Sequence, residues 1–465
     1  MKRYKIAIFI LVLILAVPSL ESAKAENETP PQFPVYVVQE GDNLYQIALR
    51  FGVSLEELKE INHITDPNTI VAGSELMIPG LAGIEGRLIT RPIKLGDTLQ
   101  SLSLEYQVPI STLLRLNHIV SPDELYSGAN LILPENLNVN RLVPKFVLKN
   151  QQSIVTLAAQ NSINPWRIIL ENHKTSGWDF TPGTVLYHLQ DSDASASAAL
   201  SPEISALSLS PDPPYQGTTV VIKVTTTSPI VLSGSLGGYP LNFFQEEDGS
   251  FVAYQGIHAQ QKPGLMVFTL NAETDDTIIY QHEQFVHIKP GSFNNETLYV
   301  DPATVDLDTN KTENQQIIDL VTKPSAEKYW TTPFSCPVDP PICIMSWFGT
   351  RRTYNDGAYT SFHSGLDLGV CSNLNVYATT PGKVIFSDSL VVRGNAILID
   401  HGWGIISGYY HLASFNVSLG DQVEAGQLIG IMGATGRVTG AHLHYELWVN
   451  GVQVNPLEWL DSSCQ

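Results

Sequence analysis

Hydrophobic residues follow three different patterns in three successive regions of the 465-residue chain. Near the N-terminus, Leu44, Ile47 and Phe51 have the spacing of one face of a helix. Between residues 204 and 288, short apolar runs such as T-V-V-I-K-V and L-M-V-F-T-L are separated by turn residues, which is typical of strands. Residues 441–449 alternate as on a strand with two different faces. The pattern predicts a mixed helix-and-strand N-terminal part and two β-rich parts after it.

The N-terminal part repeats itself with a period of 55 residues. The recurring positions include Gly73, Gly128 and Gly183, and the pairs Asn62-His63, Asn117-His118 and Asn172-His173. In the first copy we expect strands over Tyr36–Val38 and Glu75–Ile78, with two helices between them. The second helix begins after Ser54, a suitable N-cap, and Glu57 completes the pattern of a capping box. Each copy therefore predicts a βααβ unit.

This βααβ unit resembles the LysM module, which implies binding to the N-acetylglucosamine backbone of peptidoglycan or chitin. Copy one (35–79) and copy two (89–134) fit the module well, with E-G-D-N-L and L-G-D-T-L at their first helices. Copy three (145–189) has Gln151-Gln152 in place of Gly-Asp, so we expect a LysM fold that has lost glycan affinity. Weak modules in tandem gain avidity through effective concentration.

In LysM modules the sugar groove lies between the first strand–helix loop and the loop before the second strand. By this resemblance the glycan-binding residues are Gly41, Asp42, Asn43, Leu44, Gly96, Asp97, Thr98 and Leu99. The alternative interpretation is that these residues serve only the turn, the helix cap and the core.

The middle of the chain changes character after a Ser/Ala-rich linker over residues 190–203. Residues 204–290 predict an immunoglobulin-like β-sandwich, because about seven short strands are separated by regular turns. No catalytic set occurs in it, so we expect a spacer or a docking domain. Residues 291–330 are a connecting segment with one helix near Glu313–Val321, and its position relative to the C-terminal domain stays open.

Four side chains near the C-terminus can assemble a metal site. His363 and Asp367 stand in S-F-H-S-G-L-D-L-G, and His442 and His444 stand in G-A-H-L-H-Y-E. Catalytic zinc takes three protein ligands and keeps a fourth position for water or substrate. An H-x-H pair on a strand points both rings to one face. With His411 in G-Y-Y-H-L, two histidines remain for proton transfer, so the set predicts metal-assisted hydrolysis.

Residues 347–460 resemble the lysostaphin/LytM-type zinc endopeptidases, which cut peptidoglycan. The matching segments include F-H-S-G-L-D-L, V-Y-A-T-T-P-G-K-V, Y-Y-H-L and G-R-V-T-G-A-H-L-H-Y-E-L. The resemblance implies a predominantly antiparallel β domain over residues 331–465 with one Zn²⁺ per chain. It implies zinc ligation by His363, Asp367 and His444, and catalytic roles for His411 and His442. No member of this set is missing, which argues against a degenerate relative.

The other histidines are weaker candidates. His401, in I-D-H-G, lies in the same domain, and the resemblance treats its position as structural. Surface or turn positions are expected for His63, His118, His173, His188, His258, His282 and His287.

The N-terminus predicts export. Lys2, Arg3 and Lys5 precede an apolar run over residues 6–17, and A-K-A ends at Ala25, as in a cleaved signal peptide. The run is short for a membrane span, and an uncleaved anchor is the alternative. We expect no membrane span after cleavage.

The formal charge is −20, and removal of residues 1–25 leaves −23. This balance argues against nucleic acid as a partner, because phosphates require basic patches. It also argues against electrostatic adhesion to an anionic envelope polymer. The alternative meaning of the charge is solubility outside the cell.

All four cysteines lie in the C-terminal part of the chain. An even number in an exported protein indicates two disulfides, for which three pairings are possible. We expect Cys336–Cys343 as a local clasp and Cys371–Cys464 as a tie to the C-terminus. Thiolate ligation of a metal is the competing interpretation, but the chain has no C-x-x-C pair.

The expected protein is a secreted or cell-envelope monomer with three LysM units, a β-sandwich and a zinc peptidase domain. Its expected function is hydrolysis of peptide bonds in peptidoglycan stems or cross-bridges. The alternatives are a non-catalytic envelope scaffold or activator of another wall hydrolase, and a purely glycan-binding protein.

Overall fold

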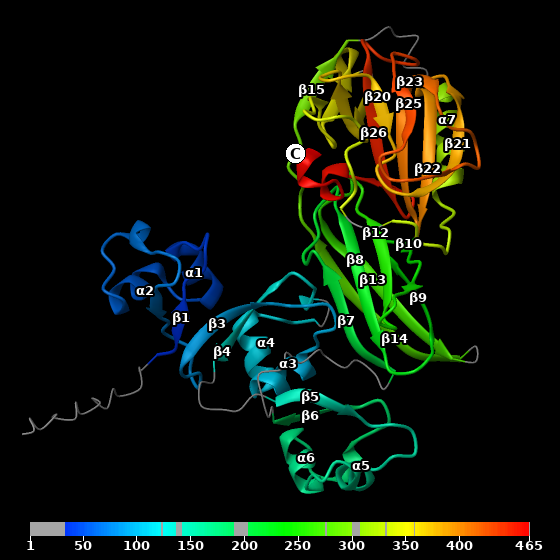
Figure 1. Ribbon diagram of the computed structural model, residues 1–465. Coiled ribbons are helices and arrows are strands. Elements are labelled where there is room, and N and C mark those ends of the chain that lie inside the picture. The colour runs from blue at the N-terminus through cyan, green and yellow to red at the C-terminus, as the bar shows by residue number, and fades with distance from the viewer. Residues whose placement is uncertain are drawn as a thin grey trace, which may run out of the picture.

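The computed structural model describes residues 33–121, 124–135, 142–189, 203–274, 277–299, 307–330, 333–357 and 359–464. The predicted signal peptide and nearly all of the predicted linker lie outside these residues. Figure 1 shows the β-sandwich between the repeats and the C-terminal domain, which runs from yellow to red. Within the described ranges no helix is both long and apolar enough to cross a membrane.

The three repeats share the predicted order of strand, two helices and strand. Copy one contains β1, α1, α2 and β2 (Val35–Val37, Leu44–Phe51, Leu55–Ile61, Glu75–Met77). Copy two contains β3, α3, α4 and β4 (Arg87–Pro92, Leu99–Tyr106, Ile110–Asn117, Asn130–Glu135). Copy three contains β5, α5, α6 and β6 (Leu142–Val147, Ile154–Gln160, Pro165–Glu171, Val185–Leu189).

Ser54 is the predicted N-cap of the second helix in copy one. The Ser54 side chain accepts a hydrogen bond from the Glu57 amide at the start of α2, and Asn62 is the C-cap. Positive φ angles place His63, His118 and His173 in the turns that follow the second helices, which confirms them as turn residues. The same expectation is wrong for His188, which is 5% exposed and lies on β6 beside Glu171.

Copies one and two share one sheet, whereas copy three has its own. β1 pairs with β2 antiparallel and with β3 parallel, giving the order β2-β1-β3-β4. β5 and β6 form a separate two-stranded sheet. The first two copies are therefore joined through their backbones, and the third contacts copy two through side chains such as Leu104, Leu142 and Tyr187.

The middle domain is a sandwich of two four-stranded sheets, with the orders β10-β9-β13-β14 and β11-β12-β8-β7. Its strands β7 to β14 span Ile204–Ser210, Thr219–Thr226, Val231–Leu236, Tyr239–Pro240, Phe244–Gln245, Phe251–Gly256, Gly264–Thr274 and Thr277–Ile288. Residues such as Val220, Ile222, Phe268 and Leu270 fill the space between the sheets. The β-sandwich is present, and its assignment as immunoglobulin-like stays a prediction.

The C-terminal domain is built on a ten-stranded sheet whose main path is β16-β19-β26-β23-β22-β21-β24. Strands β16 and β19 to β27 span Ile344–Ser346, Leu366–Gly369, Asn375–Tyr377, Gly382–Leu390, Gly394–Gly402, Ile405–Phe415, Gln422–Val423, Leu428–Met432, His442–Val449 and Val452–Val454. All pairs printed for this sheet are antiparallel. This agrees with the predicted antiparallel β domain.

The segment before this domain is integrated into it. β15 (Asn295–Leu298) pairs in parallel with β17 (Arg351–Tyr354), which pairs in turn with β18 (Tyr359–Phe362). The predicted helix is α7 (Leu307–Val321), which begins earlier than expected and buries Ile317 and Val321 against the large sheet.

The predicted disulfide pairing is wrong. Cys336 pairs with Cys464, and Cys343 pairs with Cys371, at Cα–Cα distances of 5.5 and 6.0 Å. The prediction gave weight to proximity in sequence, whereas strand pairing decides which cysteines meet.

The first disulfide follows from contacts between the two ends of the domain. Phe334 forms a parallel β-bridge with Leu460. The Phe334 amide donates to the Trp459 carbonyl, so Cys336 is carried to the C-terminal turn that holds Cys464.

The second disulfide follows from the pairing of β16 with β19. Antiparallel pairing places the start of β16 beside the end of β19. The Gly369 amide donates to the Cys343 carbonyl, so Cys371 lies within bonding reach of Cys343.

Candidate active site

Two neighbouring antiparallel strands place the proposed ligands side by side. Asp367 on β19 lies directly opposite His444 on β26. Leu443 points to the other face and is fully buried, as strand alternation requires. His363 stands just before β19 and is 1% exposed.

The three ligand atoms converge on one point. His363 Nε2 and His444 Nδ1 lie 2.9 and 2.7 Å from Asp367 Oδ1, and the two nitrogens are 3.0 Å apart. Zinc bonds of about 2.0–2.1 Å in a tetrahedron separate ligand atoms by about 3.3 Å. Zinc would therefore fit between these atoms after an outward shift of a few tenths of an ångström.

The outer nitrogen of each ligand ring is held by an acceptor. His363 Nδ1 lies 2.9 Å from the carbonyl oxygen of Trp347, and His444 Nε2 lies 3.2 Å from Glu446 Oε1. Each outer N–H then donates to its acceptor, and each inner nitrogen, once deprotonated, can offer its lone pair to a metal. This is the arrangement of metal-binding histidines with oriented rings.

The electrostatics of the cluster favour one positive charge at its centre. Burial would raise the pKa of the Asp367 carboxyl, yet hydrogen bonds from His363 and His444 hold that pKa well below its ordinary value. Burial would lower the pKa of His444, yet hydrogen bonds to Asp367 and Glu446 raise it to about 9. Either a proton on His444 or a metal ion can supply the charge, so the donor set fits zinc.

His411 and His442 face each other beside this cluster, with ring centres 5.0 Å apart. Their Nδ1 atoms lie 2.9 Å from the carbonyl oxygens of Thr435 and Gly440, respectively. Each ring can therefore donate its Nδ1–H to a carbonyl and present Nε2 to the site. His442 Nε2 lies 3.6 Å from Asp367 Oδ1.

A local irregularity in β23 presents His411 to the site. The residue has a φ of 64°, and the register of β23 shifts between its partners Asn395 and Ile397 on β22. Such bulges redirect side chains and are common beside active sites. Burial, and next the charge of the His444 ring, lower the pKa of His411 to about 3, so this ring is neutral near neutral pH.

Two residues of the site were missed by the sequence analysis. Glu446 is 1% exposed and accepts hydrogen bonds from Tyr410, Trp448 and other neighbours. Arg352 Nη2 lies 3.3 Å from Asp367 Oδ2 and leaves Oδ1 to the metal position. Glu446 continues the alternation of the H-x-H pair, and this signal could have identified it.

His401 is excluded from the metal cluster by its own partners. Its Nδ1 lies 2.8 Å from the Pro381 carbonyl and its Nε2 lies 2.7 Å from Ser407 Oγ. The ring is completely buried, which agrees with the expected structural role.

In copy one, Gly41 and Asn43 are exposed, whereas the side chains of Asp42 and Leu44 point inward. Asp42 accepts hydrogen bonds from the Tyr36 hydroxyl and from Arg50. Asn43 caps α1, and Leu44 is buried. The side chains of Asp42, Asn43 and Leu44 therefore perform the turn, cap and core roles, and their part in glycan binding stays a prediction.

In copy two, the equivalent loop is covered by the sandwich. Gly96 and Asp97 are buried, and the Gly96 amide donates to Gln284 of β14. Thr98 caps α3 through a capping box with Ser101, and Leu99 begins that helix.

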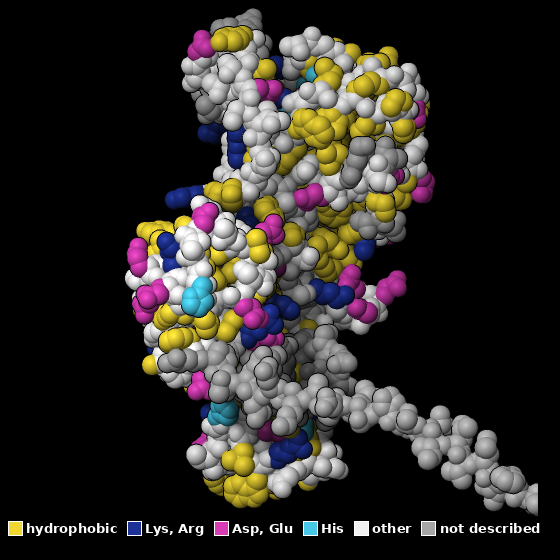
Figure 2. Space-filling model, turned by 90° about the vertical axis from the view of Figure 1, so that its left-hand side faces the viewer, with side chains coloured by type: hydrophobic (Ala, Val, Ile, Leu, Met, Phe, Trp, Pro, Cys, Tyr) yellow, Lys and Arg dark blue, Asp and Glu magenta, His cyan; other side chains and the backbone are white. Residues whose placement is uncertain are grey.

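In copy three, large apolar side chains remain exposed. Trp166, Leu170 and Trp178 are 63, 69 and 95% exposed. Hydrophobic side chains gather at the lower end of the molecule in Figure 2, over this copy. The expectation that copy three has lost glycan affinity stays a prediction.

Comparison with known proteins agrees with this architecture. The model of Peptidase family M23 matches residues 361–456, and that of the LysM domain matches residues 36–79 and 93–134. The chain therefore carries an M23 peptidase domain and two LysM domains.

Part of the chain is similar to part of each of three known proteins. The peptidoglycan DD-endopeptidase ShyA of Vibrio cholerae is 38% identical over 122 residues, which cover 26% of this chain and 28% of that protein. The DD-carboxypeptidase/endopeptidase Mpg of Neisseria meningitidis is 40% identical over 95 residues, 20% of this chain and 22% of that protein. The murein hydrolase activator NlpD of Salmonella dublin is 30% identical over 156 residues, which cover 33% of this chain and 41% of that protein. Each match spans less than half of the relative's length.

Proposed function

We propose that the chain is an exported, zinc-dependent endopeptidase that hydrolyses peptide bonds in peptidoglycan. The observation that carries this proposal is the convergence of His363, Asp367 and His444 on one point, with their outer atoms held by neighbours. Similarity to peptidoglycan DD-endopeptidases supports the substrate class.

The residues around the cluster have distinct roles in the proposed reaction. Bound zinc would polarise the scissile carbonyl and lower the pKa of the attacking water. His411, neutral and oriented by Thr435, accepts the proton of that water at Nε2. His442, oriented by Gly440, hydrogen-bonds the developing oxyanion or delivers a proton to the leaving amine. The two histidines could exchange these tasks.

The repeats supply targeting in this proposal. Glycan binding within the LysM region holds the peptidase near its substrate, which raises the effective substrate concentration. Such a role places the protein in the cell envelope or outside the cell, and the two disulfides agree with an oxidising compartment. The protein is proposed to act as a monomer with one zinc ion per chain.

The test is metal content and cleavage of purified cross-linked muropeptides by residues 26–465, with and without a chelator. About one zinc per chain and chelator-sensitive cleavage are expected. Correctly folded protein without zinc would overturn the metal site. Soluble muropeptides are the appropriate substrate, because their cleavage does not require the glycan-binding modules.

A second candidate is an activator of another wall hydrolase, which the similarity to NlpD favours. The intact ligand set argues against it, because an activator does not need an oriented metal cluster. Zinc binding without cleavage of any muropeptide, together with stimulation of a separate wall amidase, would support this candidate over the enzyme.

A further inference from the structure

Copy two is attached to the edge of the sandwich through backbone hydrogen bonds. The Ser127 amide donates to the Phe285 carbonyl at 2.8 Å, and the His287 amide donates to the Ser127 carbonyl at 3.0 Å. β14 is the edge strand of its sheet, so Ser127 continues that sheet by one residue. The Ser127 hydroxyl also donates to the Asp212 carboxylate at 2.8 Å.

The carboxamide of Gln284 connects both loops of copy two. Its Oε1 accepts from the Gly96 amide at 2.8 Å, and its Nε2 lies 3.4 and 3.3 Å from the carbonyl oxygens of Lys94 and Leu125. Gln284 is 8% exposed. One buried amide therefore satisfies a donor and two acceptors that the loops would otherwise offer to a ligand.

The 55-residue period allows each contact position to be compared between copies. Exposed Glu40 and Gly41 of copy one correspond to buried Leu95 and Gly96 of copy two. Leu95 is 4% exposed and belongs to the hydrophobic core of the sandwich.

The loop before the second strand shows the same contrast. Ala72 and Pro182 are exposed in copies one and three, whereas the equivalent Ser127 is completely buried in copy two. In copy three, Asn150 and Gln151 are also exposed at the positions of Leu95 and Gly96. Of the three copies, only the second has this loop face covered over the residues compared.

We infer that copy two is a docking module whose ligand is Gln284 of the same chain. The side-chain amide offers a carbonyl acceptor and an N–H donor, as does the N-acetyl group of an amino sugar. The groove of copy two is thus filled internally, and recognition of N-acetylated glycan falls to copy one, and to copy three only if Gln151-Gln152 in place of Gly-Asp has not abolished its affinity. The second part of this inference rests on the proposed glycan targeting, whereas the docking itself does not.

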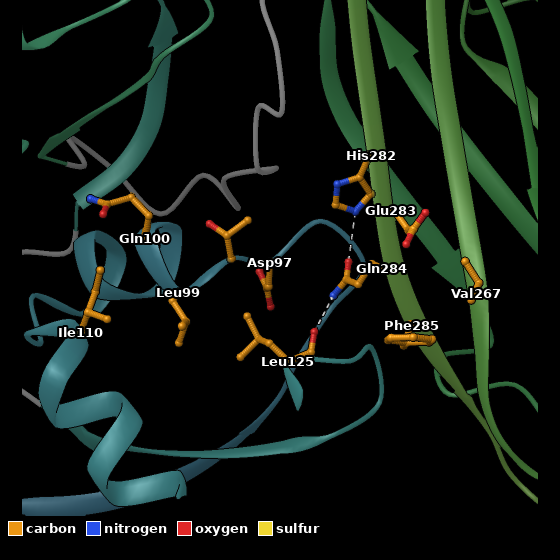
Figure 3. A pocket seen from close by; sticks show the side chains of 11 residues that line it. Asp97, Leu99, Gln100, Ile110, Leu125, Val267, His282, Glu283, Gln284 and Phe285 are labelled. Atoms are coloured by element: carbon orange, nitrogen blue, oxygen red, sulfur yellow. Dashed lines mark hydrogen bonds between the residues drawn. The ribbon is translucent and has the colours of Figure 1, made fainter. Parts of the chain in front are cut away.

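A cavity beside the Gln284 carboxamide is the other place in copy two where a sugar could bind. It has a volume of about 480 Å³ and lies between copy two and β14. Figure 3 shows Leu99, Ile110 and Leu125 on one side of it and Val267 and Phe285 on the other. Gln284 already bonds the Gly96 amide and the Lys94 and Leu125 carbonyls, so these backbone groups are not offered to a sugar in this cavity.

Hydrogen exchange of the full chain tests the docking. In the wild type we expect slower exchange in a peptide covering residues 93–99 than in its equivalent, residues 38–44. Gln284→Leu should accelerate exchange in residues 93–99 by about tenfold or more, because it removes every bond of the carboxamide. The matched control is Gln281→Leu, an exposed position on the same strand. Unchanged exchange in Gln284→Leu would overturn the docking role.

A second variant, on the other side of the contact, tests the docking independently in case Gln284→Leu does not fold. Leu95→Glu introduces the residue that copy one carries at the equivalent position. Copy two should keep its own fold, because Leu95 packs in the core of the sandwich. Accelerated exchange in residues 93–99, with residues 100–120 still protected, supports docking, whereas equal protection in both proteins contradicts it.

Titration with N-acetylglucosamine tetramer tests the assignment of glycan binding. In the wild type we expect protection at copy one or copy three and none in residues 93–99. Gln284→Leu should add protection in residues 93–99. Wild-type protection in residues 93–99 would overturn the inference. Binding to no copy would overturn the glycan assignment and the proposed targeting together, while the exchange results would still decide the docking.

Discussion

Glu446 accepts a hydrogen bond from His444 across 3.2 Å and thereby directs the other nitrogen of that ring at Asp367. The same carboxylate accepts from Ser364, Tyr410, Trp448 and Gln453, so it cannot rotate away. The orientation of the metal-binding ring is therefore fixed by a side chain that does not itself reach the metal position.

Replacement of Glu446 should weaken metal binding. Glu446→Gln keeps an acceptor for His444 but removes the charge, and Glu446→Leu removes both. We expect zinc affinity to fall by about 10- to 100-fold in Glu446→Leu and by less in Glu446→Gln. Competition with a chromophoric chelator measures both affinities. Equal affinities in all three proteins would show that Glu446 does not orient His444.

Substitution of a metal ligand and substitution of a catalytic histidine should have different effects on zinc binding. Asp367→Ala should lose zinc and cleavage together, because this carboxylate contacts both ligand rings. His442→Ala should retain zinc and lose about 10²- to 10⁴-fold in rate, the usual contribution of a general acid or base. Metal analysis and muropeptide cleavage test both, with the exposed Asp388→Ala as control. Cleavage by His442→Ala at the wild-type rate would exclude its catalytic role.

The site was predictable because strand alternation is a strong local signal. His442, His444 and Glu446 share one face of β26, and the first two were identified from their spacing. Glu446 obeys the same alternation, but its role is to orient His444, and the spacing of metal ligands does not indicate such a role. A carboxylate in such a buried strand requires partners, which is itself a signal of function.

Other features had no local signal because distant segments create them. Arg352 reaches Asp367 from a small separate sheet, and Gln284 meets Gly96 across 188 positions of sequence. The disulfide pairing depends on which strands lie side by side, which spacing between cysteines does not encode. The 55-residue repeat, in contrast, predicted the helices and strands of all three copies well.

Acid should destabilise the protein partly through His401. Burial lowers the pKa of this ring to about 4, below its ordinary value of 6.5. Between these two pKa values the unfolded chain binds a proton at His401 and the folded chain does not. The free energy of unfolding therefore falls as pH falls from about 6.5 towards 4. The loss is at most about 3.4 kcal/mol.

Urea unfolding of wild type and His401→Gln at several pH values measures this contribution. The variant should be less stable at pH 7 and should show a shallower decline between pH 6.5 and 4.5. The exposed His63→Gln serves as the control. Parallel pH profiles for wild type and His401→Gln would contradict a depressed pKa at this position.

The two disulfides should contribute unequally to stability. Cys336–Cys464 closes a separation of 128 residues and Cys343–Cys371 one of 28. Chain entropy assigns about 5 kcal/mol to the longer loop and about 3.6 kcal/mol to the shorter. The double variant Cys336→Ser/Cys464→Ser should therefore be about 1.4 kcal/mol less stable in urea than Cys343→Ser/Cys371→Ser. Peptide mapping under non-reducing conditions provides the control, and recovery of a Cys336–Cys343 fragment would contradict the pairing itself.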